Sequence, residues 1–148
     1  MENNVQQVQI GLSAVNEKTF RYHPEKLSDN FDPKLIKMSF TNGINGLNVE
    51  KNMISIVFGA KYSYENQDIL ECVYSFDFGV KDLKRFVTVN PNKSVKIDVI
   101  MPHLINTAIG TLRGIILVNT EGSPLRNYPL PMINAEQMLK GMANMQKK

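Results

Sequence analysis

The sequence has one cysteine, two histidines and no tryptophan among its 148 residues. A single cysteine cannot form an internal disulfide, so the fold does not depend on oxidation. A zinc site built from cysteine and histidine needs four ligands, which these residues cannot supply. The sequence therefore excludes a disulfide scaffold and a cysteine–histidine zinc domain, and we expect neither a metal nor another cofactor.

The sequence also lacks a long apolar run. Its longest apolar stretch, residues 97–118, contains Asp98, Pro102 and Arg113. It therefore does not match the ~20 predominantly apolar residues of a membrane span. The N-terminus, MENNVQQVQI, does not have the basic and then apolar pattern of a secretory signal. We expect a cytoplasmic protein that does not insert into a membrane.

The sequence has only a small excess of positive charge: it contains 17 basic and 14 acidic residues, which give a net charge of +3. A pI near 9.0 permits an acidic partner but does not imply one. The basic residues within 80–96 have aromatic support only from Phe86. A solvated loop is the favoured interpretation of this stretch, a nucleic-acid interface is the alternative, and we expect no nucleic acid as a partner.

What is present is the composition of an ordinary globular domain. The chain is 43% hydrophobic and 21% charged, which is typical of soluble folded proteins. Its length suits one domain with a sizeable core. We expect a single domain over residues 1–148, rich in strands over 5–80 and helical over 97–145.

Alternation of apolar and polar residues predicts four strands in the first half. Between the first two lies a connector, Phe20–Pro33, with two prolines and three aromatic residues. The Asn-Gly pairs at 42–43 and 45–46 predict turns. The last two strands, separated by a polar turn, predict an antiparallel hairpin. The predicted strands are at about Val8–Ala14, Lys34–Thr41, Met53–Tyr64 and Ile69–Gly79.

One face of the predicted hairpin carries half of the chain's aromatic residues and must be covered. Apolar residues at three- and four-residue spacing predict a long helix over 97–118, with Pro102 near its first turn. A second helix is predicted at about Ala135–Met145, with Asn134 as its N-cap. We therefore predict an α+β fold, in which a four-stranded antiparallel sheet has a long helix and a C-terminal helix packed on one side.

Signals for catalysis are weak. Cys72 lies in the middle of a predicted strand, and a buried, inert thiol is favoured over a pair with His23 or His103. The segment Thr41–Gly46, TNGING, has neither glycine spacing of a phosphate-binding loop. Sequence spacing also pairs no two carboxylates for acid–base work. We do not expect an enzyme.

Apolar residues occur where one domain has difficulty burying them. The connector carries Phe20, Tyr22 and Phe31 among charged residues, and the predicted last helix has a methionine-rich stripe. Core packing and pinning of the connector are the simpler interpretations. Together, however, these residues fit self-association combined with an adaptable apolar groove, because methionine side chains are flexible and polarisable.

The order of elements and several landmarks resemble the SecB export chaperones and their SecB-like relatives. The resemblance covers about Val5–Leu139 and is closest over Met101–Leu139. It consists of element order and scattered landmarks rather than a catalytic motif. The landmarks in this sequence are Phe20, Phe31-Asp32-Pro33, Pro102, Arg113-Gly114, Leu130-Pro131 and Asn134.

The resemblance implies an ATP-independent holdase that binds unfolded or extended apolar polypeptide segments, in protein export or a related process. It also implies a homotetramer, a dimer of dimers, in which the long helices form the interface. Carried over to this chain, the interface residues are Leu104, Ile105, Ile109 and Leu112. The expected client contacts are Phe20, Tyr22, Phe31, Met138, Leu139 and Met142.

The sequence departs from the export chaperones in its charge. Members of that family are acidic and use carboxylates on the sheet to contact the translocase motor, whereas this chain is net basic and has Glu71 one position early. A one-residue change moves a side chain to the other face of a strand. The departure argues against the motor as a partner. A SecB-like chaperone of a toxin–antitoxin system is therefore an alternative, and a carrier of small hydrophobic ligands is another.

Overall fold

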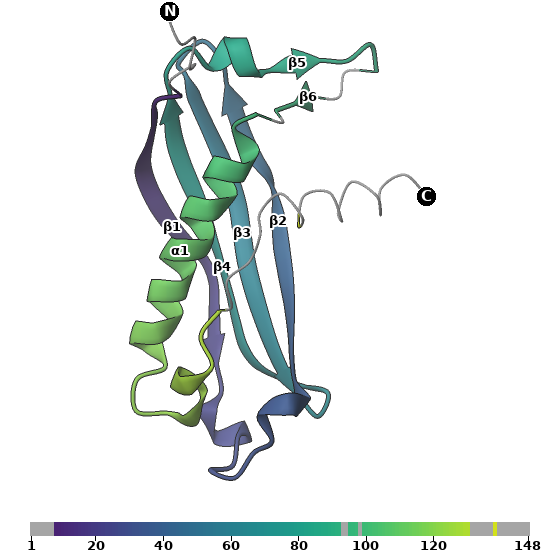
Figure 1. Cartoon of the computed structure of the whole chain (residues 1–148), viewed down its shortest axis with the longest axis vertical. Coiled ribbons are helices and arrows are strands. Elements are labelled where there is room, and N and C mark those ends of the chain that lie inside the picture. The colour runs from purple at the N-terminus through teal and green to yellow at the C-terminus, as the bar shows by residue number, and fades with distance from the viewer. Residues whose placement is uncertain (1–7, 93–94, 98, 131–137, 139–148) are drawn as a thin grey trace, which may run out of the picture.

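The computed structural model describes residues 8–92, 95–97, 99–130 and Met138. These residues form two layers, a four-stranded antiparallel sheet and one long helix packed on it (Figure 1). The predicted α+β fold, a four-stranded antiparallel sheet with a long helix on one side, is confirmed, and the predicted C-terminal helix at about Ala135–Met145 lies outside the described residues. The elements are β1 (Ile10–Tyr22), β2 (Ile36–Asn48), β3 (Met53–Tyr64), β4 (Gln67–Val80), β5 (Thr88–Val89), β6 (Val95–Lys96) and α1 (Met101–Asn119).

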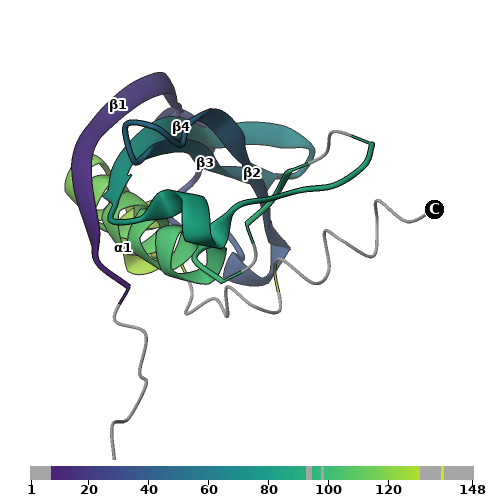
Figure 2. The same ribbon diagram turned by 90° about the horizontal axis from the view of Figure 1, so that it is seen from above.

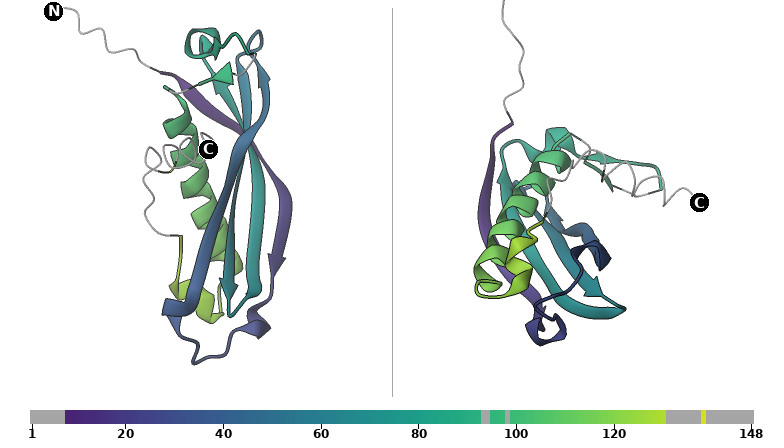
Figure 3. Two further views of the ribbon diagram at one scale, coloured as in Figure 1. Left: turned by 90° about the vertical axis from the view of Figure 1, so that its right-hand side faces the viewer. Right: turned by 60° about the horizontal axis from the view of Figure 1, so that its bottom comes forward.

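The order of strands in the sheet is β1-β4-β3-β2, so β1 and β2 occupy opposite edges. The connector between them, residues 23–35, passes around one end of the sheet and contains two short 3₁₀ turns (Figure 1). It is fastened at its start, where the backbone N–H of His23 donates to the carbonyl of Ile69. Viewed along the sheet, the strands twist and α1 lies on one side only (Figure 3).

The β3–β4 hairpin is fixed by its turn. Glu65 and Asn66 both have positive φ, 50° and 65°. A two-residue loop of this kind matches the twist of an antiparallel pair. Tyr64 consequently pairs with Gln67, and after one register shift between Ser63 and Tyr62 the pairing runs to Met53 opposite Gly79. The predicted bounds of the third strand are confirmed.

Two boundaries differ from the sequence prediction by several residues and change where site residues lie. β2 continues through both Asn-Gly pairs as far as Asn48, and a bulge between Ile44 and Gly46 absorbs the irregularity. β1 extends to Tyr22, so Phe20 and Tyr22 lie on a strand and not in the connector. In both cases pairing with a long neighbouring strand outweighs the local turn and polar signals, since strand preference depends on context.

The core lies between α1 and the central strands (Figure 2). Pro102 occupies the first turn of α1, where its missing N–H costs nothing. The helix ends at Asn119 and is capped by Thr120, whose backbone N–H and hydroxyl both donate to the carbonyl of Ile116. The buried residues of α1 are Leu104, Ile105, Ala108, Ile109, Leu112 and Ile116.

By length and composition, α1 is also apolar enough to cross a membrane, with a mean hydropathy of 1.2 over 19 residues. Its apolar stripe is buried inside the protein. The opposite face carries the exposed polar residues His103, Asn106 and Thr107. This two-sided pattern is that of a helix packed on a core.

Gly59 marks a close approach within the sheet. A Cβ atom built on this residue would lie 2.8 Å from the carbonyl oxygen of Cys72 and 2.8 Å from Cγ2 of Val73. One of these neighbours is backbone and cannot move without disturbing the β3–β4 ladder. By contrast, a Cβ on Gly43 in β2 would meet nothing within 4 Å.

We predict that Gly59→Ala lowers the free energy of unfolding by about 2 kcal/mol, because the added methyl group overpacks the centre of the sheet. Gly43→Ala is the matched control and should leave stability within about 0.5 kcal/mol. Urea denaturation of the two variants measures both values. Equal stability of the two would contradict the close contact at Gly59.

Candidate functional site

The strand register arranges the helix-facing side chains in rows that cross all four strands. Each row runs from β1 through β4 and β3 to β2. Three successive rows are Tyr22–Leu70–Tyr62–Met38, then Phe20–Cys72–Ala60–Phe40, then Glu17–Tyr74–Phe58–Asn42.

The helix covers these rows unevenly. It packs on β3 and β4, whose helix-facing residues such as Phe58 and Phe76 are fully buried. The β2 end of each row is less covered, and Ile44 on β2 retains 47% of its accessible surface. Figure 1 shows β2 lying clear of α1. We call the apolar helix-facing side chains of this strand the β2 strip: Ile36, Met38, Phe40, Ile44 and Leu47.

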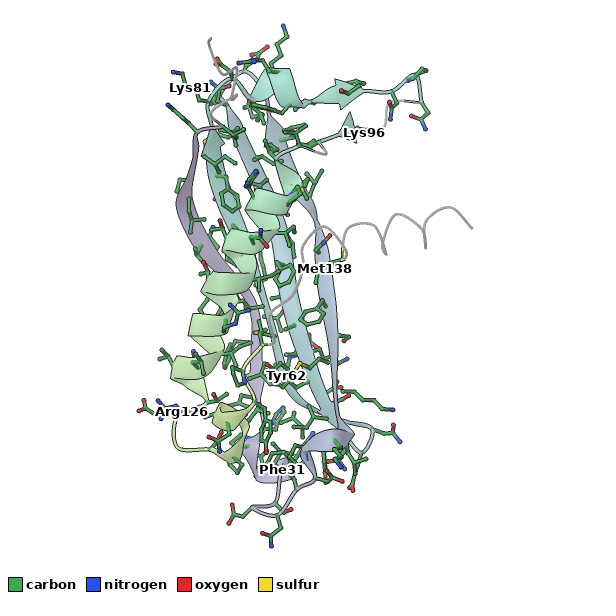
Figure 4. All side chains as sticks on the ribbon, viewed as in Figure 1. Phe31, Tyr62, Lys81, Lys96, Arg126 and Met138 are labelled. Atoms are coloured by element: carbon green, nitrogen blue, oxygen red, sulfur yellow. The ribbon has the colours of Figure 1, made fainter. Side chains whose placement is uncertain are left out.

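An aromatic cluster closes one end of the β2 strip. The ring of Phe31, from the connector, meets Tyr64 edge-on at 5.9 Å and Tyr128 at 5.3 Å between centroids. The backbone N–H of Asp32 donates to the Tyr64 hydroxyl at 3.1 Å, and the Tyr62 hydroxyl donates to the carbonyl of Tyr128 at 3.3 Å. The connector is therefore tied both to the sheet and to the segment that follows α1 (Figure 4).

The structure divides the predicted client contacts between the two edges of the sheet. Phe31 lies at the end of the β2 strip, and Met138 is half-buried against the core over the β2 side (Figure 4). Phe20 and Tyr22 are on β1, and the Tyr22 hydroxyl is hydrogen-bonded to Ser123. Three strand spacings separate Phe20 from Phe40, about 14 Å. The four predicted contacts within the described residues therefore lie toward two different edges of the sheet, and Leu139 and Met142 lie outside the described residues.

The predicted interface residues of the long helix are buried within the single chain. Leu104, Ile105, Ile109 and Leu112 are at most 3% exposed within the chain itself, so no side-chain surface remains for another subunit. Their stripe packs on the sheet of the same chain, a distinction that helical periodicity cannot make. The outward face of α1 instead carries Thr107, Gly110, Gly114 and Val118, and Val118 is 72% exposed.

Cys72 is buried, as predicted. Its thiol donates to the carbonyl of Ala60 at 3.8 Å, and burial raises the pKa of this thiol from 9.0 to about 11. A thiol held neutral in this way is a poor nucleophile at neutral pH. Burial also raises the pKa of Tyr74, to about 12, and the Tyr74 hydroxyl donates to Oε1 of Glu17 at 3.1 Å.

The described residues offer no group of three histidine, cysteine or acidic side chains that could hold a metal ion. A polar hollow of about 170 Å³ lies beside the end of β1 and the start of β4, with Arg21 and Glu71 in its lining. Its carboxylates are already engaged, because Lys61 Nζ lies 3.2 Å from Asp68 Oδ2 and 3.8 Å from Glu71 Oε2. The geometry is that of a surface ion network rather than an acid–base pair.

Sequence reasoning missed the most unusual polar group of the site. Asn42 lies between Phe40 and Ile44 on the helix-facing side of β2, opposite Phe58. Its Nδ2 atom is buried without a hydrogen-bond partner, alone in this respect among the side chains of the described residues. The Asn-Gly pair predicted a turn at this point, which hid the fact that Asn42 interrupts an apolar face.

The raised pKa of Cys72 predicts a loss of stability at alkaline pH. The unfolded chain releases the thiol proton above pH 9.0, whereas the native protein retains it up to about pH 11. The unfolded state then binds fewer protons, so the free energy of unfolding falls by about 1 kcal/mol between neutral pH and pH 10. Urea denaturation of the wild type and Cys72→Ala across this range measures the difference. Parallel pH profiles would contradict it, since the tyrosines are common to both proteins.

No family model matches the sequence, and no curated protein matches it. Among solved structures, the chain is similar to the crystal structure of a protein of unknown function from Streptococcus agalactiae. That similarity has 10% sequence identity and a TM-score of 0.43, and it covers 86% of this chain and 98% of the other. A similarity at this level carries no argument about function.

Proposed function

We propose that this protein is an ATP-independent holdase of the SecB-like kind, which binds extended apolar segments of unfolded polypeptides on the β2 strip. The observation that carries the proposal is the uneven cover of the sheet. α1 buries helix-facing side chains of the central strands such as Phe58 and Phe76, yet it leaves the apolar side chains of β2 half-buried and Ile44 47% exposed. The resemblance of the sequence to SecB-like chaperones supports the same function.

The energetics of such a surface suit weak and repeated capture. Covering apolar surface contributes about 25 cal/mol per Å², from which the ordering of the client must be subtracted. The half-buried residues Met38, Phe40 and Leu47 have only part of their surface left to contribute. A client is therefore held loosely, without nucleotide, and released by dissociation. The aromatic cluster fixes the connector and thus the lower end of this surface.

A small-ligand carrier, the alternative from another class, fits the packing less well. The hairpin face that would line its pocket is filled, because Phe58, Phe76 and Phe78 are fully buried against the rest of the core. We therefore favour a polypeptide as the ligand. An export role and a toxin–antitoxin role differ in which client is bound. The β2 strip would serve either role in the cytoplasm.

We further propose that copies of the chain associate as a homotetramer, a dimer of dimers, in which the outward face of α1 forms the interface between the two dimers. Gly110 and Gly114 on this face carry no side chain and have open space where a Cβ would be. Val118 at its end is 72% exposed. Small residues let helices approach closely, and an exposed valine gains from being covered. This surface replaces the buried stripe that the sequence predicted.

Replacing Ile44 tests the client surface. We expect Ile44→Ser to weaken binding of an unfolded model client about fivefold, because roughly 1 kcal/mol of apolar burial is lost. The matched control is Val89→Ser, which removes a valine that is 66% exposed on β5, away from the β2 strip. Suppression of client aggregation, measured by light scattering across chaperone concentrations, gives the comparison. Equal suppression by both variants would reject the β2 strip as the client surface.

Replacing Gly110 tests the assembly. Gly110→Leu removes a helical glycine that has open space around it, so it should stabilise each subunit by up to about 1 kcal/mol. The same side chain would obstruct close packing of two helices, and we expect the solution mass to fall from tetramer to dimer. Gly11→Leu, at another glycine with open space, is the control. An unchanged mass in sedimentation would reject the α1 interface.

A further inference from the structure

The two edges of the sheet are protected to different degrees. β1 has two register irregularities against β4 and carries Glu17, Lys18 and Arg21. β2 has one irregularity, and Lys37 is its single charged residue over 13 positions. Bulges and charges are the usual means by which edge strands avoid pairing with other chains. β2 is therefore the edge that is better able to accept another strand.

The outer side of β2 has hydrogen-bonding groups available. Within the described part of the chain, β2 pairs with β3 alone. Alternate backbone N–H and C=O groups of an edge strand point away from its partner, and a strand added there pairs with them. The residues on the two faces differ. The helix-facing side presents the β2 strip, and the other side presents small or polar residues such as Ser39 and Thr41.

Asn42 gives this edge a chemical preference. Its buried Nδ2 lacks an acceptor while its neighbours Phe40 and Ile44 are apolar. Side chains directly opposite in an antiparallel pair have Cβ atoms about 5 Å apart. Because Nδ2 is buried, the Asn42 amide must rotate toward the edge, and a carboxylate opposite it would then accept the hydrogen bond that the chain itself leaves unmade. The charged residues between Pro33 and Val49 are Lys34 and Lys37. Both are positive, which also favours a partner segment that carries a carboxylate.

We propose that a partner polypeptide adds as a fifth strand, antiparallel to the free edge of β2, through an extended segment whose apolar side chains lie over Phe40 and Ile44 and whose carboxylate accepts from Asn42 Nδ2. The proposal rests on the proposed holdase function, because it specifies the conformation and chemistry of the segment held there. Main-chain hydrogen bonds do not depend on the side chains of the bound segment, so segments of many sequences can bind. The carboxylate sets the preference among them.

Main-chain pairing is tested with a nine-residue synthetic peptide in which valine alternates with threonine around one central glutamate. Two versions carry N-methyl groups on alternate amides, one set on the odd and one on the even residues. A strand at an edge directs only one set of its amides to its neighbour. We expect one version to bind at least tenfold more weakly than the parent and the other within about twofold, since several hydrogen bonds are lost in only one of them.

Equal loss, or no loss, in both methylated peptides would overturn strand addition, and so would a parent peptide that does not bind. Amide hydrogen exchange gives an independent readout. Addition of the parent peptide should slow exchange at alternate residues of β2 and leave β1 unchanged. Uniform slowing, or none, would overturn the proposal. Aggregation suppression that still depends on Ile44 would then leave the holdase function standing, so the two failures are distinguishable.

The role of Asn42 is tested by a double-mutant cycle. Asn42→Leu is combined with a peptide in which leucine replaces the central glutamate. We expect Asn42→Leu to weaken the glutamate peptide at least fivefold and to leave the leucine peptide equal or tighter, because only the former loses a hydrogen bond. Thermal unfolding of Asn42→Leu serves as the check on folding. Equal changes for both peptides would overturn the assignment of the carboxylate to Asn42.

Discussion

The packing of one helix on four strands determines the rest of this structure. A helix is about 10 Å wide, and strands lie about 4.8 Å apart, so one helix shields roughly two strands. The apolar stripe of α1 packs mainly on β3 and β4. The edge strand β2 therefore keeps apolar side chains that α1 cannot reach. The candidate site is a direct result of this mismatch in width.

The connector and the aromatic cluster give the remaining surface a defined shape. Phe31 joins Tyr64 at the end of β3 to Tyr128, which follows α1. Residues more than sixty positions apart are thereby held in one contact network at the end of the sheet. Phe20 and Tyr22 lie at the opposite edge of the sheet, on the helix-facing side of β1. Aromatic residues of one sequence segment thus serve two separate parts of the fold.

Much of the fold could be predicted from sequence, and the reasons are local. The alternation over Met53–Tyr64 and the polar turn after it fix β3 and its hairpin, and the periodicity over 97–118 fixes α1. Pairing between distant strands could not be predicted in the same way. It carries β2 past both Asn-Gly pairs and turns Asn42 from a turn residue into a buried one. Periodicity likewise shows that Leu104 and Ile109 share a stripe, but not which surface covers it.

The order of strands in the sheet also constrains how the chain can fold. β2, β3 and β4 follow one another through short turns, so they can assemble as soon as they are made. β1 must wait, because Ile10 pairs with Val80 and Tyr22 with Leu70. Closing so large a loop is entropically costly and slow. During synthesis, β1 therefore leaves the ribosome before the other three strands of its sheet and pairs last of the four, so its apolar residues stay uncovered until β4 has been made.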